Sequence, residues 1–194
     1  MPRERLTAFT DGVLAVIITI MVLELKPPGG FHLSNLAEIA PTLLGYVLSF
    51  GYVAIYWNNH HHFFHPVERV NGTLLWANLN LLFWLSLVPF TTAWMGASHF
   101  APEPTALYGA SLLACALSWY LMQTLIIQGQ GPHSVLRRAL GSDLKGKISP
   151  VLYLIGIGLS FAAPLAGAAV YFLVALMWLA PDRRIERALG EGGH

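Results

Sequence analysis

The stretch that decides the fold begins with Arg5-Leu6-Thr7-Ala8-Phe9-Thr10-Asp11 and runs directly into the apolar residues 12–25. Roughly 20 residues, at a rise of 1.5 Å each, just span a hydrocarbon core of about 30 Å. Residues 7–26 are therefore predicted to form a first transmembrane helix. Before Glu24, this helix contains a single ionisable residue, Asp11.

Asp11 needs a partner if it lies in or near the bilayer, because an unpaired charge there costs about 2.5 kcal/mol or more. We expect its carboxylate to face protein or water and to accept from a donor, and Arg5, six residues earlier, is one candidate. The simpler alternative is that Thr10 and Asp11 only cap the helix N-terminus, as Thr and Asp often do.

The composition, with 55% hydrophobic and 11% charged residues, excludes an ordinary soluble globule. Clusters of Pro, Gly and charged residues divide the remaining chain into five further apolar segments. We predict an all-α membrane protein with six transmembrane helices in one domain, residues 1–182, and a short tail, residues 183–194. The predicted spans are 7–26, 33–64, 70–95, 105–128, 148–163 and 165–180.

Charge predicts the orientation of these spans. The loops on one side of the membrane receive every Lys and Arg of the chain except Lys26. This strong positive-inside pattern places both termini in the cytoplasm. We expect the protein in the inner, or plasma, membrane. The segment Arg3-Glu4-Arg5 leads into a full-length span without a small-residue cleavage site, so we expect no signal peptide.

The N-terminal motif resembles that of the prokaryotic TMEM175-like potassium channels, also known as the DUF1211 integral membrane proteins. The family signature is Arg-x-x-x-Phe-Ser-Asp, and Arg5, Phe9, Thr10 and Asp11 match it with Thr in place of Ser. Residues 57–64 and 75–91 are similar to the second and third helices of the family. The resemblance implies a homotetramer of six-helix subunits with the first helix lining a central pore. It also implies K⁺ as the permeant ion, with other monovalent cations possible, and no cofactor.

One face of the first helix suits such a pore. Val16, Ile20 and Leu23 fall at i, i+4 and i+7, and Thr19 lies beside Ile20. Repeated around an axis, these residues would form stacked apolar constrictions with one hydroxyl layer, and no Thr-Val-Gly-Tyr-Gly filter is present. The resemblance places Val16, Ile20 and Leu23 at the constriction, whereas an aliphatic stripe at helical spacing is, on its own, usually a sign of plain helix packing.

A structural network is predicted behind the motif. Trp57 and His61, at i and i+4, are expected to reach Asp11 or Thr10 from the second helix, and Asn78 is expected to join from the third. Such a network would fix the pore helix to its scaffold.

The histidine run 60–62, with His65 one turn after His61, also invites a metal interpretation. Consecutive helical residues point about 100° apart, so only His61 and His65 share a face. No acid or Cys is near them in sequence, and we predict no metal site.

We therefore predict a potassium-selective, or weakly selective, leak-type cation channel, with lipid and copies of itself as partners and no nucleic acid. A secondary transporter of a small cation or solute would predict an inverted repeat and mid-membrane acids, and neither is found. A membrane enzyme would need a nucleophile motif or a complete metal set. A non-conducting membrane scaffold is the remaining alternative.

Overall fold

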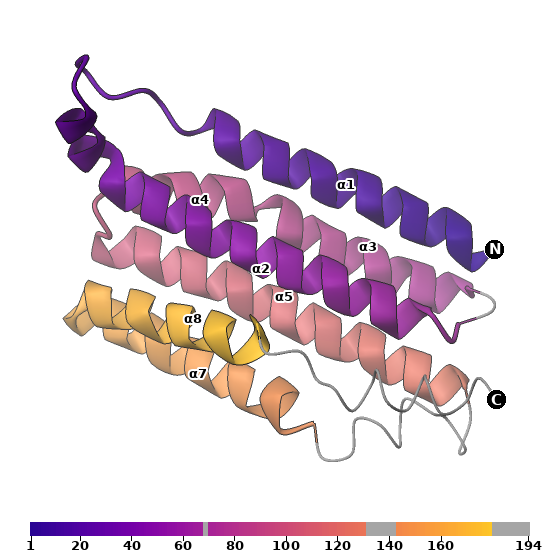
Figure 1. Ribbon diagram of the computed structural model, residues 1–194. Helices are drawn as coiled ribbons and strands as arrows, with labels where there is room; N and C mark the ends of the chain where they lie inside the picture. Colours follow the sequence, from indigo (N-terminus) through magenta and orange to yellow (C-terminus); the bar gives the residue numbers. More distant parts are fainter. Residues whose placement is uncertain (68–69, 131–142, 180–194) are drawn as a thin grey trace.

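The computed structural model describes residues 1–67, 70–130 and 143–179, and the elements within these ranges are all helices (Figure 1). The helices lie side by side along one common direction. Among the described residues, five segments are long and apolar enough to cross a membrane: Arg3–Leu23, Leu33–Phe64, Gly72–Ala97, Pro102–Gly129 and Leu144–Ala162. Pro164–Leu179 is a shorter apolar helix of 16 residues. The predicted all-α membrane fold is confirmed. The elements are α1 (Arg3–Leu23), η1 (Leu33–Ile39), α2 (Ala40–Phe64), α3 (Gly72–Ser86), α4 (Val88–Ala97), α5 (Pro102–Gly129), α7 (Leu144–Ala162) and α8 (Pro164–Leu179).

Helix α1 begins earlier than the predicted span, at Arg3, and its N-cap is Pro2, which makes no side-chain capping bond. Thr10 and Asp11 therefore lie well inside the helix, and the alternative that they cap its N-terminus is wrong. After Leu23, the residues Pro27-Pro28-Gly29-Gly30 prevent the helix from continuing.

Prolines set two further boundaries. Pro41 stands in the first turn of α2. The N–H groups of a first turn have no acceptor within the helix, so a proline there costs no helical hydrogen bond. Pro89 interrupts the predicted third span, 70–95, so that α3 ends at Ser86 and α4 starts at Val88. Inside a helix, proline removes a hydrogen bond and its ring clashes with the preceding turn. The two helices still follow each other as one crossing (Figure 1).

Helix α5 packs against α3, α4, α7 and α8, and it is the longest helix that the structure describes, with 28 residues. The hairpin of α7 and α8 turns at Ala163–Pro164. A Cβ atom added at Gly156 would clash with the Tyr171 ring, and one at Gly167 would clash with Ser160. Small residues therefore allow the close approach of these two helices, as in other membrane helix pairs.

The centre of the bundle contains buried hydroxyl groups that pair across helices. The Ser49 hydroxyl lies 2.6 Å from the Thr92 hydroxyl and 2.9 Å from the Tyr108 hydroxyl. The Tyr52 hydroxyl donates to the main-chain carbonyl of Tyr171 at 2.5 Å. These bonds join α2, α4, α5 and α8 and pair the buried hydroxyl groups within the bundle.

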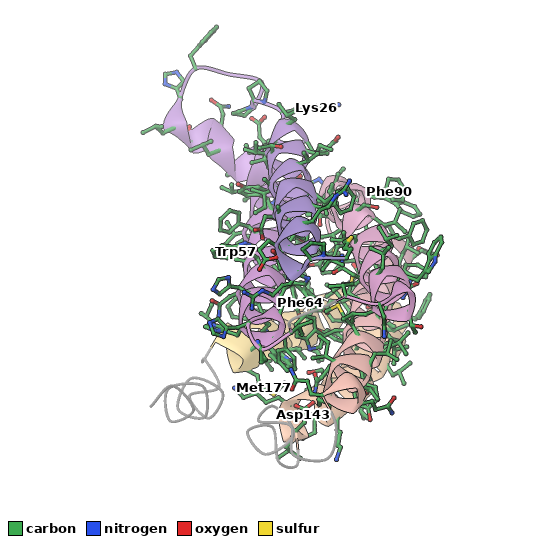
Figure 2. All side chains as sticks on the ribbon, turned by 90° about the vertical axis from the view of Figure 1, so that its right-hand side faces the viewer. Lys26, Trp57, Phe64, Phe90, Asp143 and Met177 are labelled. Carbon is green, nitrogen blue, oxygen red and sulfur yellow. The ribbon has the colours of Figure 1, made fainter. Side chains whose placement is uncertain are left out.

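The two ends of the bundle differ in charge. The α1–η1 connection and the α7–α8 turn lie at one end, and the N-terminus and the α2–α3 connection lie at the other (Figure 1). Lys26 belongs to the first end, and Asp143, at the start of α7, to the second (Figure 2). The described basic residues of the second end are Arg3, Arg5, Lys145 and Lys147. Arg69, Arg137, Arg138 and the predicted tail, residues 183–194, lie outside the described residues.

Candidate functional site

Helix α1 has two distinct faces. The face toward the bundle consists of residues that are each at most 3% exposed: Leu6, Thr10, Leu14, Ile17 and Met21. The predicted pore residues lie on the outward face, where Val16 is 55%, Ile20 43% and Leu23 78% exposed, and Thr19 is also exposed. The structure therefore directs these four side chains away from their own subunit.

The Thr19 side chain is held in a defined orientation. Its hydroxyl donates to the main-chain carbonyl of Val16 at 2.9 Å, within the same helix. Because the proton is used in this bond, the oxygen keeps its lone pairs for another donor or for a cation. The outward face of α1 thus carries one layer of oxygen acceptors among aliphatic side chains.

An open groove runs beside this face, between α1 and the α3–α4 junction. Gly12 forms part of its floor, and a Cβ atom added there would meet nothing within 4 Å. The lining residues are Ala8, Phe9, Gly12, Val13, Val16, Ile17, Ile20, Ser86 and Pro89. Phe9 of the motif is 53% exposed and belongs to this groove rather than to the core.

Asp11 receives a hydrogen bond from the second helix. The Trp57 indole Nε1 donates to the Asp11 carboxylate at 3.0 Å. Both side chains are exposed in the single subunit. This contact ties α1 to α2 at the point where the carboxylate would otherwise face lipid or water without a protein donor.

A buried chain of three polar side chains lies next to this contact. The Asn78 amide nitrogen donates to the Thr10 hydroxyl at 2.9 Å, and the Asn78 carbonyl oxygen lies 2.9 Å from His60 Nε2. Since that oxygen can only accept, His60 Nε2 carries the proton. Thr10, Asn78 and His60 are each at most 2% exposed, so α1, α2 and α3 meet in one closed polar contact.

His60 occupies the position that was predicted for His61. His61 is exposed, and its contact is with the ring of His62 at 5.7 Å between centroids. On a helix, the residues three and four positions after Trp57 lie near the same face as Trp57, and these are His60 and His61. His60 is the one that is turned toward the core, so it reaches the buried Asn78. The His60 ring also stacks on Phe64 at 4.3 Å, which fixes its plane.

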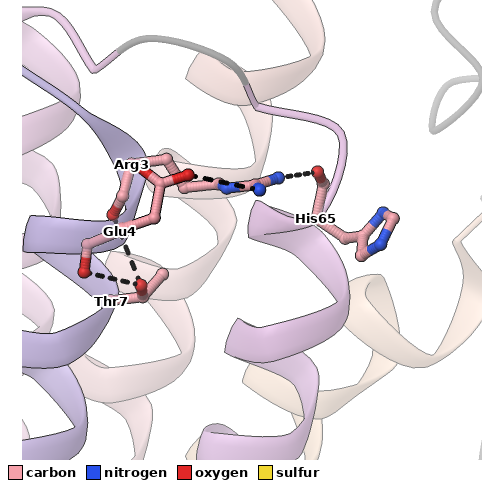
Figure 3. A network of polar contacts seen from close by, with 4 residues as sticks. All are labelled: Arg3, Glu4, Thr7 and His65. Atoms are coloured by element: carbon pink, nitrogen blue, oxygen red, sulfur yellow. Dashed lines mark hydrogen bonds and ion pairs between the residues drawn. The ribbon is translucent and has the colours of Figure 1, made fainter.

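Arg5 does not pair with Asp11. It is exposed and makes no hydrogen bond or ion pair with the residues that the structure describes. Six helical residues correspond to about 600°, which turns Arg5 away from Asp11. Arg3 instead anchors the start of the helix: its guanidinium donates to the main-chain carbonyl of His65 and lies 3.4 Å from Glu4 (Figure 3).

The N-terminus is held in place by the backbone as well. The Met1 amino group donates to the Val70 carbonyl at 2.8 Å, and the Val70 N–H donates to the Met1 carbonyl at 3.0 Å. Together with the Arg3 contact, these bonds fix the first turn of α1 to both ends of the α2–α3 connection. In the described part of the chain, no three His, Cys, Asp or Glu side chains are grouped so as to hold a metal ion.

Comparison with known proteins matches the sequence motif to a family. Residues 5–89 match the profile of the family described as "Endosomal/lysosomal potassium channel TMEM175". A potassium channel of Chryseobacterium sp. (strain P1-3) is 52% identical over 191 residues, which cover 98% of this chain and 100% of that protein. A potassium channel of Streptomyces collinus is 31% identical, with 90% of both chains covered.

The fold agrees with this match. The crystal structure of a lysosomal potassium-selective channel TMEM175 homolog from Chamaesiphon minutus superimposes with a TM-score of 0.78 at 28% identity, covering 93% of this chain and 97% of that one. Similarity in sequence and in structure thus extends over the full length, and the chain belongs to the TMEM175 family.

Proposed function

We propose that this chain assembles as a homotetramer into a potassium-selective leak channel whose pore is lined by α1. The names of the bacterial relatives support potassium as the ion. The observation that carries the pore assignment is the outward face of α1, on which Val16, Ile20 and Leu23 are 43–78% exposed while the opposite face is buried. This face has no partner within the described subunit, so it must face lipid or further copies of the chain.

A single α1 face cannot enclose a path for ions. Several copies arranged as a closed ring are therefore required, and the family resemblance implies four. The groove around Gly12 supports this arrangement, because it leaves room for a neighbouring helix to approach α1 closely. Two contacts hold α1 to α2 and α3, namely the Asp11–Trp57 bond and the Thr10–Asn78–His60 contact. Neither contact uses the outward face of α1, which remains available to other copies of the chain.

Conduction through such a ring would depend on two kinds of layer. Val16, Ile20 and Leu23 would form apolar constrictions that open and close to water by wetting and dewetting. Thr19 would supply one oxygen per subunit to an ion that has lost part of its hydration shell. Because the Thr19 proton is bonded to the Val16 carbonyl, these oxygens can act as acceptors for a cation.

The orientation follows from charge. The basic residues Arg3, Arg5, Lys145 and Lys147 lie at the end of the bundle that holds the N-terminus, and Lys26 lies at the other. By the positive-inside rule, the N-terminal end would face the cytoplasm of a cell membrane. The C-terminal tail would then lie on the same side.

Ion flux from proteoliposomes tests the proposal. The purified protein is reconstituted with a potassium gradient or with a sodium gradient, and dye-reported flux and reversal potentials are measured against protein-free liposomes. Potassium flux that exceeds sodium flux, from a particle with the mass of four subunits, is expected. A monodisperse, correctly inserted protein that passes neither ion would favour the non-conducting scaffold instead.

A further inference from the structure

A further space lies on the side of α2 that faces away from α1. It is a cavity of about 30 Å³ between α2, α5, α7 and α8. Its walls are mainly aromatic and are formed by Tyr52, Tyr56, Trp119, Tyr120, Tyr153 and Trp178. None of the lining residues is an acid, a lysine or an arginine, so the cavity favours an uncharged occupant.

Three side chains that line this cavity have a polar atom without a hydrogen-bond partner among the described residues. Asn59 and the Tyr56 hydroxyl make no hydrogen bond there. Gln123, 5% exposed, donates its amide nitrogen to Asp143 at 2.8 Å, which leaves its carbonyl oxygen without a donor. Unpaired polar groups within a membrane helix bundle are costly, so a molecule that pairs with them would be held.

Two other polar groups of the wall are already paired with each other. The Trp178 indole donates to the Ser149 hydroxyl at 2.8 Å, and that hydroxyl donates to the Lys145 carbonyl at 2.8 Å. Tyr56, Asn59 and Gln123 thus offer donors and acceptors that no described residue satisfies, and the Tyr120 hydroxyl is likewise unpaired on a side chain that is 47% exposed. The volume accommodates about two water molecules or one solute of similar size.

We propose that this cavity is a binding site for a small uncharged molecule that carries a hydroxyl group, either water or a short-chain alcohol. Its hydroxyl bridges Asn59 on α2 and Gln123 on α5, and the aromatic walls enclose any short apolar part. Tyr56 and Asn59 directly precede Trp57 and His60, the two α2 residues that contact α1 and α3. A molecule bound here would therefore contact α2, the helix that holds α1 in place. An effect of this molecule on the pore rests on the proposed channel function.

Stability distinguishes a filled site from an empty one. Asn59→Leu is compared with Asn58→Leu, the same change at the preceding, exposed residue of α2. If water is bound, Asn59→Leu removes one of its partners and lowers the Tm in detergent by about 3 °C relative to Asn58→Leu. If the cavity is dry, the change removes an unpaired amide and raises the Tm, which would overturn the proposal.

Ethanol serves as the probe for alcohols, with saturation-transfer NMR as the readout. Ala116 lines the cavity, and Ala110 is exposed on the same helix, so Ala116→Leu fills the site and Ala110→Leu is the matched control. We expect Ala116→Leu to reduce the ethanol signal at least two-fold and Ala110→Leu to leave it unchanged. A lowered Tm in Asn59→Leu with equal ethanol signals assigns the site to water. Equal ethanol signals with a raised Tm contradict the site altogether. Neither readout depends on ion conduction.

Discussion

Asn78 is expected to be the most sensitive polar residue of the motif network. Replacing Asn78 by Leu keeps the side-chain size but removes both of its hydrogen bonds, at 2.9 Å to Thr10 and 2.9 Å to His60. Both partners are at most 2% exposed and have no access to bulk water. Hydrogen bonds between membrane helices are worth about 0.6 kcal/mol on average and up to about 1.7 kcal/mol. Two such bonds within a closed site predict a loss of about 2 kcal/mol in the free energy of unfolding.

The assay is an SDS titration of the detergent-solubilised protein followed by far-UV circular dichroism. Asn58→Leu is the control, because Asn58 is exposed on α2 and makes no hydrogen bond with the described residues. It should change the free energy of unfolding by about 0.5 kcal/mol or less. A double-mutant cycle with Thr10→Val then isolates the bond between α1 and α3 and should give a coupling energy of about 1 kcal/mol. Strict additivity, or equal effects of Asn78→Leu and Asn58→Leu, would refute the reasoning.

Three further changes test other contacts. Asp11→Asn weakens the charge-assisted hydrogen bond from Trp57 and should lower the free energy of unfolding by about 1 kcal/mol or more in the same SDS titration. An unchanged midpoint of the titration would show that the carboxylate is not needed for stability. Thr19→Val removes one layer of oxygen atoms from the outward face and should reduce the preference for potassium over sodium, measured by reversal potentials. An unchanged ratio of potassium to sodium permeability would mean that Thr19 has no role in ion selection. Gly156→Ala should destabilise the α7–α8 hairpin by about 1–3 kcal/mol, because the new methyl group meets Tyr171. Gly158→Ala places its methyl group in open space and should be tolerated. A lower Tm for Gly158→Ala than for Gly156→Ala would contradict the packing described.

Hydropathy was sufficient to predict an all-α membrane fold, because each crossing needs an apolar run of fixed length whatever its neighbours are. It could not predict the division of the third span. Pro89 was visible in the sequence, but only the backbone shows that α3 stops at Ser86 and that α4 starts at Val88. Many membrane helices pass through a proline with only a kink, so the residue type alone does not decide between a kink and a break.

The candidate site was predictable to the level of the helix face but not of the single residue. The spacing of Val16, Ile20 and Leu23 identified one face of α1, which the structure leaves exposed. The choice between His60 and His61 depends on how α2 is rotated against α3, and adjacent residues in a histidine run carry no signal for that rotation. The contacts of Ser49 with Thr92 and Tyr108, 43 and 59 residues away, likewise have no pattern in the sequence.

The central claim is that the outward face of α1 lines a water-filled ion path, and cysteine accessibility tests it most directly. The chain has one cysteine, Cys115, which is buried, so the background reaction is low. Ile20→Cys, on the outward face, and Ile17→Cys, 3% exposed on the opposite face, are reconstituted and treated with a charged, membrane-impermeant methanethiosulfonate. We predict that the reagent blocks potassium flux through Ile20→Cys and leaves Ile17→Cys unaffected. Block of Ile17→Cys with no effect on Ile20→Cys would contradict the assignment of the pore to this face of α1.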